Sequence, residues 1–350
     1  MLNRYRIVLL VVAAMVAAAI AVAVLRPQAP PTLAGTGSNA RLLPVGQRSP
    51  APEFTGIDAW INSPPLSVSG LRGRVALIDF WTFSCVNCVR TIPHLQALYS
   101  AYRSRGFVII GVHSPEFDFE KMYANVVAAV GRRGVTWPVA VDSEMATWNA
   151  YGNQVWPAEY LLDQRGRVTY VNLGEGNYVQ TDSAVASLLG ASVRPMPSST
   201  SASNQLTPEL YVGSARGQLG DGEAYGPMGQ PTEYVDPGPP QAHDQVQITG
   251  TWSDHGQYLE SDTPGHVRLL FRATDVFVVM GSSGGQPLNV SVTLDVAAVP
   301  TALSGAAVPA SEVSVSRQDL YALLRGITPG YHLIDLTVPA GLQLYTFTFG

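Results

Sequence analysis

Cysteine is scarce in this chain of 350 residues, which contains only Cys85 and Cys88. A disulfide between them would close a loop too short for a useful structural staple. A tetrahedral zinc site would have to recruit two of the six histidines. Covalent haem attachment would need a histidine where the chain has Val89. The scarcity therefore predicts reversible redox chemistry at Cys85 and Cys88, with no metal and no other cofactor.

Charged residues are also few, at 13% of the chain, and the formal net charge is -5. Because the chain has no excess of basic residues, we expect no nucleic-acid partner. Hydrophobic residues make up 46% of the sequence, which is enough for substantial apolar cores. The composition therefore predicts folded domains.

A long apolar run is present near the N-terminus, from Ile7 to Leu25, and two arginines precede it. A helix of about 19 residues would be about 28 Å long, close to the hydrocarbon thickness of a bilayer. The preceding positive charges predict that the rest of the chain is extracytoplasmic. A cleaved signal peptide is the alternative, since Ala21-Val22-Ala23 resembles a cleavage site. We expect residues 1–26 to anchor the chain in a bacterial cytoplasmic membrane, with its soluble domains on the periplasmic or cell-wall side.

The periodicity of apolar residues changes along the chain and predicts two domains. Residues 27–48 and 191–204 are rich in small, polar and proline residues, as linkers are. Residues 49–190 alternate buried strands with helices, which predicts a parallel βαβ arrangement. Residues 205–350 show short runs of period two, which predicts an antiparallel, jelly-roll-like β-sandwich. Within these domains we expect strands at 75–81, 107–112 and 139–141, helices at 92–103, 119–132, 144–151 and 181–189, a hairpin at 156–171 and a long loop at 218–244.

The residues around the cysteines, Trp81-Thr82-Phe83-Ser84-Cys85-Val86-Asn87-Cys88, resemble the TlpA-like branch of the thioredoxin superfamily. With matches at 211–216 and 345–350, the chain is most similar to the extracytoplasmic C-terminal part of DipZ-type proteins. The resemblance implies an α/β thioredoxin-like domain followed by an all-β sandwich similar to carbohydrate-binding modules. DipZ-type proteins also carry a multi-helix membrane domain that conducts electrons. For the single predicted span here, we expect a separate membrane electron donor of the CcdA/DsbD type.

The cysteine motif predicts a nucleophile and a resolving thiol. Cys85 is expected at the start of a helix, where backbone N–H groups and the helix dipole favour a thiolate. Cys88 lies three positions further along, on the same face, and can resolve the mixed disulfide.

The resemblance implies further site residues. Asp79 matches a buried acid that moves the proton of Cys88, and Pro157 matches a cis-proline that presents backbone to an extended substrate. Trp81 and Trp156 are predicted to line the substrate face beside Pro157. Two further acids, Glu116 and Glu159, are candidates for an auxiliary carboxylate near the cysteines, with an ordinary exposed glutamate as the alternative for each.

These observations predict a membrane-tethered thiol:disulfide oxidoreductase that reduces or isomerises disulfides of exported proteins, as in cytochrome c maturation. A thiol peroxidase of the redoxin type is an alternative, because Thr82 to Cys85 form a T-x-x-C pattern. Another is a glycan- or protein-binding module with a redox-sensing domain, in which the sandwich binds cell-wall glycan. Several aromatic residues could stack on sugar rings, although alternating aromatics in strands usually pack in the core: Trp252, Tyr258, Tyr321, Tyr345 and Phe347.

Overall fold

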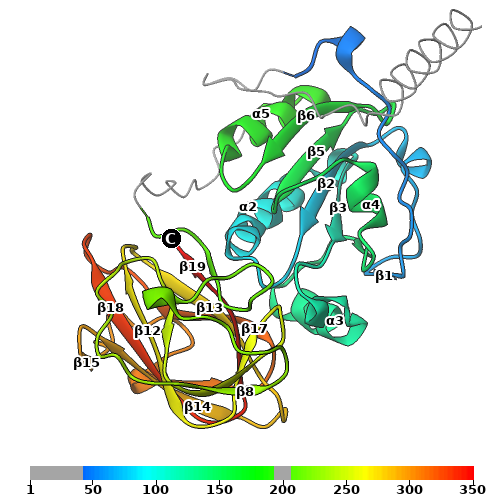
Figure 1. Cartoon of the computed structure of the whole chain (residues 1–350). Helices are drawn as coiled ribbons and strands as arrows, with labels where there is room; N and C mark the ends of the chain where they lie inside the picture. The colour runs from blue at the N-terminus through cyan, green and yellow to red at the C-terminus, as the bar shows by residue number, and fades with distance from the viewer. Residues whose placement is uncertain (1–41, 193–205) are drawn as a thin grey trace, which may run out of the picture.

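The computed structural model describes residues 42–192 and 206–350, which form an α/β domain and an all-β domain side by side (Figure 1). The predicted membrane anchor lies outside these residues. Within the two described ranges, no helix combines the length and the apolar character that crossing a membrane requires.

The α/β domain is built on a six-stranded sheet in which the strands predicted at 75–81 and 107–112 run parallel at the centre, the second of them extending to His113. The strand order is β1-β4-β3-β2-β5-β6, with β1, β5 and β6 antiparallel to their neighbours. The strands are β1 (Ala59–Ile61), β2 (Val75–Trp81), β3 (Phe107–His113), β4 (Val139–Val141), β5 (Ala158–Leu162) and β6 (Val168–Leu173). The helices are α2 (Val86–Tyr102), α3 (Tyr123–Arg132), α4 (Ala146–Ala150) and α5 (Tyr178–Leu189).

Alternation along the fully buried strand β2 divides the core of this domain into two layers. Leu77 and Trp81 pack in one cluster with residues of α2, α3 and α5. Ile78 and Phe80 point to the opposite face and pack with residues of α4. Asp79 shares the parity of Leu77, so its side chain lies on the face that α2 covers.

The helices differ from the sequence prediction mainly at their starts. Helix α2 begins at Val86, directly after its N-cap Cys85 as the cysteine motif predicts, and so extends six residues before the periodic segment at 92–103. The helix expected at 119–132 is divided into a 3₁₀-helix, η4 (Asp118–Lys121), and α3. Met122 between them is extended, with φ -71° and ψ 113°, and this interrupts the helix. Helix α5 begins at Tyr178 in place of residue 181.

The all-β domain consists of two antiparallel sheets that enclose one apolar core, as predicted for a sandwich. The first sheet has the order β17-β13-β19-β11-β10-β8, with β7 paired to β19, and the second has the order β15-β14-β18-β12-β9, with β16 paired to β14. The strands of the first sheet are β7 (Leu210–Tyr211), β8 (Pro231–Tyr234), β10 (Gly250–Asp254), β11 (Leu259–Ser261), β13 (Val276–Ser282), β17 (Asp319–Leu324) and β19 (Leu342–Phe349). Those of the second are β9 (Gln247–Ile248), β12 (Gly265–Phe271), β14 (Leu288–Leu294), β15 (Ala297–Ala298), β16 (Glu312–Val315) and β18 (His332–Val338).

The segment 218–244, expected to be a loop, contains strand β8. Proline at the first position weakened the strand signal, but an edge strand tolerates proline there because one of its sides forms no ladder. Three of the aromatic candidates for sugar stacking, Trp252, Tyr345 and Phe347, are buried, so they contribute to packing and offer no exposed platform.

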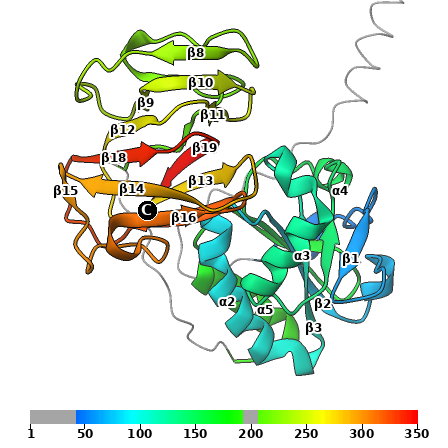
Figure 2. The same ribbon diagram turned by 90° about the horizontal axis from the view of Figure 1, so that it is seen from below.

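The two domains share an interface next to α2 and α3 (Figure 2). Tyr345 and Val279 of the sandwich belong to the same apolar cluster as the helix-packed face of the α/β sheet. Asp319 of the sandwich is nearly buried and forms ion pairs with Arg132 at 2.8 Å and Arg133 at 3.6 Å. Apolar and charged contacts together hold the two domains against each other.

Removing the Phe347 ring from the sandwich core is expected to destabilise the protein strongly. Its side chain has no exposed surface and lies in the central strand β19. Phe347→Ala should lower the free energy of unfolding of the sandwich by about 3–5 kcal/mol, since the cavity is only partly refilled. Val235, which is 73% exposed, provides the control, and Val235→Ala should stay within about 0.5 kcal/mol of wild type. Urea denaturation measures both, and equal midpoints would contradict the core assignment.

Candidate active site

Cys85 is the N-cap of helix α2 and is partly exposed. Its backbone is extended, and its sulfur accepts a hydrogen bond from the backbone N–H of Cys88 at 3.2 Å. The first N–H groups of a helix have no partner within the helix, and the positive end of the helix dipole lies at the same place. The sulfur of Cys85 therefore lies beside unpaired backbone donors at a place that a substrate can reach.

Cys88 lies one turn into α2 and is only 2% exposed. Burial raises the pKa of the Cys88 thiol well above its usual value, and contacts with Cys85 and the nearby Asp79 add to the rise. Both cysteines are free thiols in this structure. Because Cys88 holds its proton firmly, its attack on a mixed disulfide needs a base nearby.

Two buried carboxylic acids lie on the face of the sheet that α2 covers. Asp79 of β2 and Glu159 of β5 are direct cross-strand partners, 3% and 1% exposed. Burial raises the pKa of each, and the repulsion from Glu159 raises the pKa of Asp79 further. Among the described residues, Asp79 Oδ1 and Glu159 Oε1 have no hydrogen-bond partner. Two such acids cannot both ionise at low cost, so the pair resists losing both of its protons.

A buried histidine–aspartate pair lies behind these acids. His94 of α2 and Asp182 of α5 are 2.8 Å apart, between Nε2 and Oδ1. The electrostatic effect of His94 lowers the pKa of Glu159, against the larger effect of burial. Thr181 donates a hydrogen bond to Glu159 Oε2 at 2.9 Å. The sequence analysis did not single out His94, Thr181 or Asp182, because helices α2 and α5, which carry them, are separated from Glu159 and from each other in the sequence.

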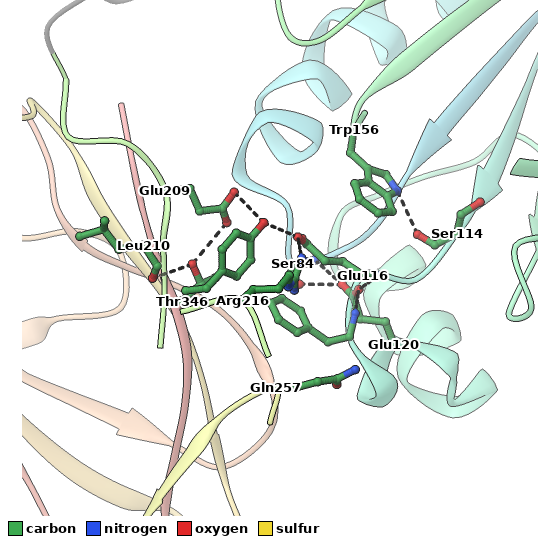
Figure 3. Close-up of polar contacts among 12 residues, drawn as sticks. Ser84, Ser114, Glu116, Glu120, Trp156, Glu209, Leu210, Arg216, Gln257 and Thr346 are labelled. Atoms are coloured by element: carbon green, nitrogen blue, oxygen red, sulfur yellow. Dashed lines mark hydrogen bonds and ion pairs between the residues drawn. The ribbon is translucent and has the colours of Figure 1, made fainter. Parts of the chain in front are cut away.

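Of the three residues predicted to line the substrate face, Trp156 is partly exposed, whereas the side chains of Pro157 and Trp81 are buried. The Trp156–Pro157 peptide bond is cis. Trp156 is partly exposed, packs against Trp148 at 4.2 Å and donates from Nε1 to Ser114 O at 3.0 Å (Figure 3). Trp81, by contrast, is 2% exposed, because the alternation of β2 turns its ring into the core. The prediction that Trp81 contacts substrate is therefore wrong.

Comparison with known proteins agrees with this architecture. Residues 45–189 match the Redoxin family, and residues 207–350 match the family described as thioredoxin like C-terminal domain. Over 321 residues the chain is 35% identical to Protein DipZ of Mycobacterium tuberculosis. The aligned region covers 86% of this chain and 43% of DipZ. The chain thus spans less than half the length of that relative.

Smaller relatives cover the α/β domain alone. Over 114 residues the chain is 30% identical to the thiol-disulfide oxidoreductase ResA of Halalkalibacterium halodurans, which covers 33% of this chain and 62% of ResA. Over 127 residues it is 28% identical to the thiol-disulfide oxidoreductase YkuV of Bacillus subtilis, which covers 36% of this chain and 85% of YkuV. The Redoxin match and these two relatives support the resemblance of the α/β domain to the TlpA-like thioredoxin family. This thioredoxin-like domain carries the cysteine pair at the start of helix α2.

Glu116, one of the two auxiliary acids suggested by the resemblance, faces the sandwich. Its Oε1 accepts hydrogen bonds from Tyr211 Oη at 2.6 Å and from Arg216 Nη1 at 2.9 Å (Figure 3). The carboxylate that contacts the segment leading to Cys85 belongs to Glu120, which the sequence analysis did not single out. Glu120 is fully buried, and burial raises its pKa although hydrogen bonds from Ser84 oppose the rise.

Thr82 and His113 form a buried pair beneath the cysteine motif of the thioredoxin domain. Thr82 Oγ1 lies 3.3 Å from His113 Nε2. Burial lowers the pKa of His113 to about 3, so its ring is neutral at physiological pH. The ring also stacks on Phe83, with 5.5 Å between centroids. The hydroxyl of the T-x-x-C pattern is thus hydrogen-bonded to this histidine.

Proposed function

We propose that this protein is a membrane-tethered, extracytoplasmic thiol:disulfide oxidoreductase that reduces or isomerises disulfides of exported proteins. One observation carries the proposal: a reachable sulfur, Cys85, caps helix α2, and a second sulfur, Cys88, is buried directly behind it. The names of ResA and YkuV, both thiol-disulfide oxidoreductases, support the same reaction class.

The reaction consists of two exchanges that together move two electrons to the substrate. The Cys85 thiolate attacks one sulfur of the substrate disulfide, so that a Cys85–substrate disulfide forms and the other substrate sulfur leaves as a thiolate. Cys88 then gives its proton to the Asp79–Glu159 pair and attacks the Cys85 sulfur. The second substrate thiolate leaves, and the protein holds a Cys85–Cys88 disulfide. In isomerisation, a different substrate thiolate attacks the substrate sulfur of the mixed disulfide before Cys88 attacks, so that a new substrate disulfide forms and Cys85 leaves as a thiolate.

Each cycle leaves an oxidised pair that needs a reductant. The apolar run at 7–25 supports a location at a membrane surface, where a membrane electron donor of the CcdA/DsbD type would deliver electrons to Cys85 and Cys88. A strained or exposed disulfide is readily reduced, and the partial exposure of Cys85 suits such an exchange between two proteins.

Insulin reduction tests the proposed function. The purified full-length chain with dithiothreitol should precipitate insulin B chain several times faster than dithiothreitol alone, as followed by turbidity. A rate equal to that of dithiothreitol alone would contradict the proposal. Hydrogen peroxide consumption, measured on the same preparation, tests the peroxidase alternative. We expect no consumption above that of the reductant, because the Thr82 hydroxyl is hydrogen-bonded to His113.

A further inference from the structure

The carboxylate of Glu120 joins two segments of the thioredoxin domain (Figure 3). One oxygen, Oε1, accepts from the backbone N–H of Ser84 at 3.2 Å and from the Ser84 hydroxyl at 2.6 Å. The other, Oε2, accepts from the backbone N–H groups of Glu116 at 2.6 Å and Phe117 at 3.1 Å. Ser84 directly precedes Cys85, so Glu120 connects the residue before the nucleophile to the backbone of Glu116 and Phe117.

The same segment is held from its other side by the sandwich. Arg216 lies over the ring of Phe117, 4.9 Å from its centroid, and over the ring of Tyr211, 3.8 Å from its centroid. Its guanidinium also forms an ion pair with Glu116 at 2.9 Å. Tyr345 packs edge-on against Phe117, with 5.2 Å between centroids. Apolar, cation–π and charged contacts therefore converge on a few residues of one short segment.

We propose that the β-sandwich positions Cys85 through a chain of contacts that runs from Arg216 and Tyr211 through Glu116 and Glu120 to Ser84. Glu120 is the positioning residue of this chain. The sandwich is then a working part of the active site, whatever else it binds. This inference deepens the proposed function and rests on it for its biological meaning, but its contacts are independent of the substrate.

The physical basis is that a buried carboxylate is tolerated only when donors surround it. Four donors from two segments fill the acceptor positions of Glu120, and hydrogen bonds to an ionised group are about twice as strong as neutral ones. Displacing Glu116 and Phe117 would leave Glu120 with hydrogen bonds from Ser84 and Thr82 only and would loosen the backbone before Cys85. The helix cap at Cys85 requires one backbone conformation, so loosening it lowers the fraction of reactive sulfur.

Glu120→Gln tests the positioning role, because the direction of the change in the alkylation rate of Cys85 distinguishes positioning from an effect of charge. The amide nitrogen of glutamine donates, so it cannot accept from the N–H groups that one carboxylate oxygen now binds, and the segment should loosen. In a full-length Cys88→Ser background, alkylation by iodoacetamide at pH 7 reports Cys85 alone. We expect the second-order rate constant to fall about tenfold. If Glu120 acted only through its negative charge, the neutral amide would favour the thiolate and the rate constant would rise.

Arg216→Met tests the contribution of the sandwich in the same background. It removes the ion pair with Glu116 and the contacts with the rings while keeping a long apolar side chain. We expect alkylation of Cys85 to slow about threefold. Arg268→Met is the matched control, because Arg268 pairs with Asp236 and Asp335 within the sandwich, and its rate constant should equal that of the parent. Ser84→Ala, which removes only one hydroxyl donor to Glu120, should give a smaller decrease than Glu120→Gln.

The outcomes are decisive in both directions. Slower alkylation in Glu120→Gln and Arg216→Met with unchanged Arg268→Met supports the coupling, provided that melting temperatures show folded protein. An unchanged rate in Arg216→Met, or a faster rate in Glu120→Gln, would overturn it. If Glu120→Gln fails to fold, Arg216→Met and Ser84→Ala still decide the question. Alkylation needs no disulfide substrate, so a failure of insulin reduction would remove the proposed function and leave this result intact.

Discussion

Cys85→Ser is expected to abolish insulin reduction, lowering the catalysed rate by at least about a thousandfold. A serine hydroxyl does not form an appreciable anion at neutral pH, so no mixed disulfide can form. Serine is nevertheless among the best N-cap residues. Helix α2 should therefore remain capped, and the melting temperature should stay within a few degrees of wild type. Turbidity and calorimetry measure the two effects, and residual insulin reduction above dithiothreitol alone would refute the assignment of Cys85 as nucleophile.

Cys88→Ser is the matched variant that separates the two sulfurs. Cys85 can still attack, but nothing resolves the product, so a covalent protein–substrate disulfide should accumulate. Mass spectrometry should show this adduct on Cys85, and added dithiothreitol should release it. An equal amount of adduct with wild type would contradict the resolving role of Cys88, which its buried position directly behind Cys85 suggests.

Local patterns in the sequence were sufficient for the framework of the site. The apolar run at 75–81 predicted a buried strand, and strand β2 has these bounds. Alternating residues in 267–271 and 332–338 predicted sandwich strands, and β12 and β18 form there. Burial on two sheet faces and a change of periodicity can be recognised from neighbouring residues alone.

Contacts between segments that are distant in the sequence could not be predicted from such local patterns. Nothing near Glu120 distinguishes it from Asp118 or Glu116, and its burial depends on Ser84, 36 residues away. The opposite error occurred at Trp81, which was predicted to line the substrate face and is buried. Its position at the end of a strand buried along its whole length was the signal that could have assigned it to the core.

The second large effect is expected at the Asp79–Glu159 pair. Asp79→Asn removes the base nearest Cys88 and should slow resolution of the mixed disulfide about 10- to 100-fold at pH 7. Glu159→Gln leaves Asp79 in place but removes a like charge, so the pKa of Asp79 should fall. Asp79 then becomes a weaker base, and resolution at pH 7 should slow by a smaller factor.

The pH dependence of the rate at which Cys88 resolves the mixed disulfide tests whether Asp79 and Glu159 share a proton. In wild type the rate should rise with pH as the pair loses its first proton, and the raised pKa values place that rise above the ordinary carboxyl range. In Glu159→Gln the rise should move to lower pH. Glu312→Gln, which removes an exposed carboxylate of the sandwich, is the control and should leave the profile unchanged. Superimposable profiles for wild type and Glu159→Gln would exclude a shared proton.

Asp79→Asn should raise the free energy of unfolding at pH 7, although it lowers the rate of resolution. Because the pKa values of Asp79 and Glu159 are raised in the folded state, the folded protein binds more protons than the unfolded chain between the ordinary and the raised values. The free energy of unfolding therefore falls as pH rises through that window.

Asp79→Asn removes this penalty and should stabilise the protein at pH 7 by more than about 1 kcal/mol, with no gain below about pH 4. Urea denaturation at both pH values measures this difference. A variant that is slower and more stable at pH 7 would show that the buried acid is retained for catalysis at the expense of stability, whereas a destabilised Asp79→Asn would mean that the carboxylate is held by favourable contacts and is no proton store.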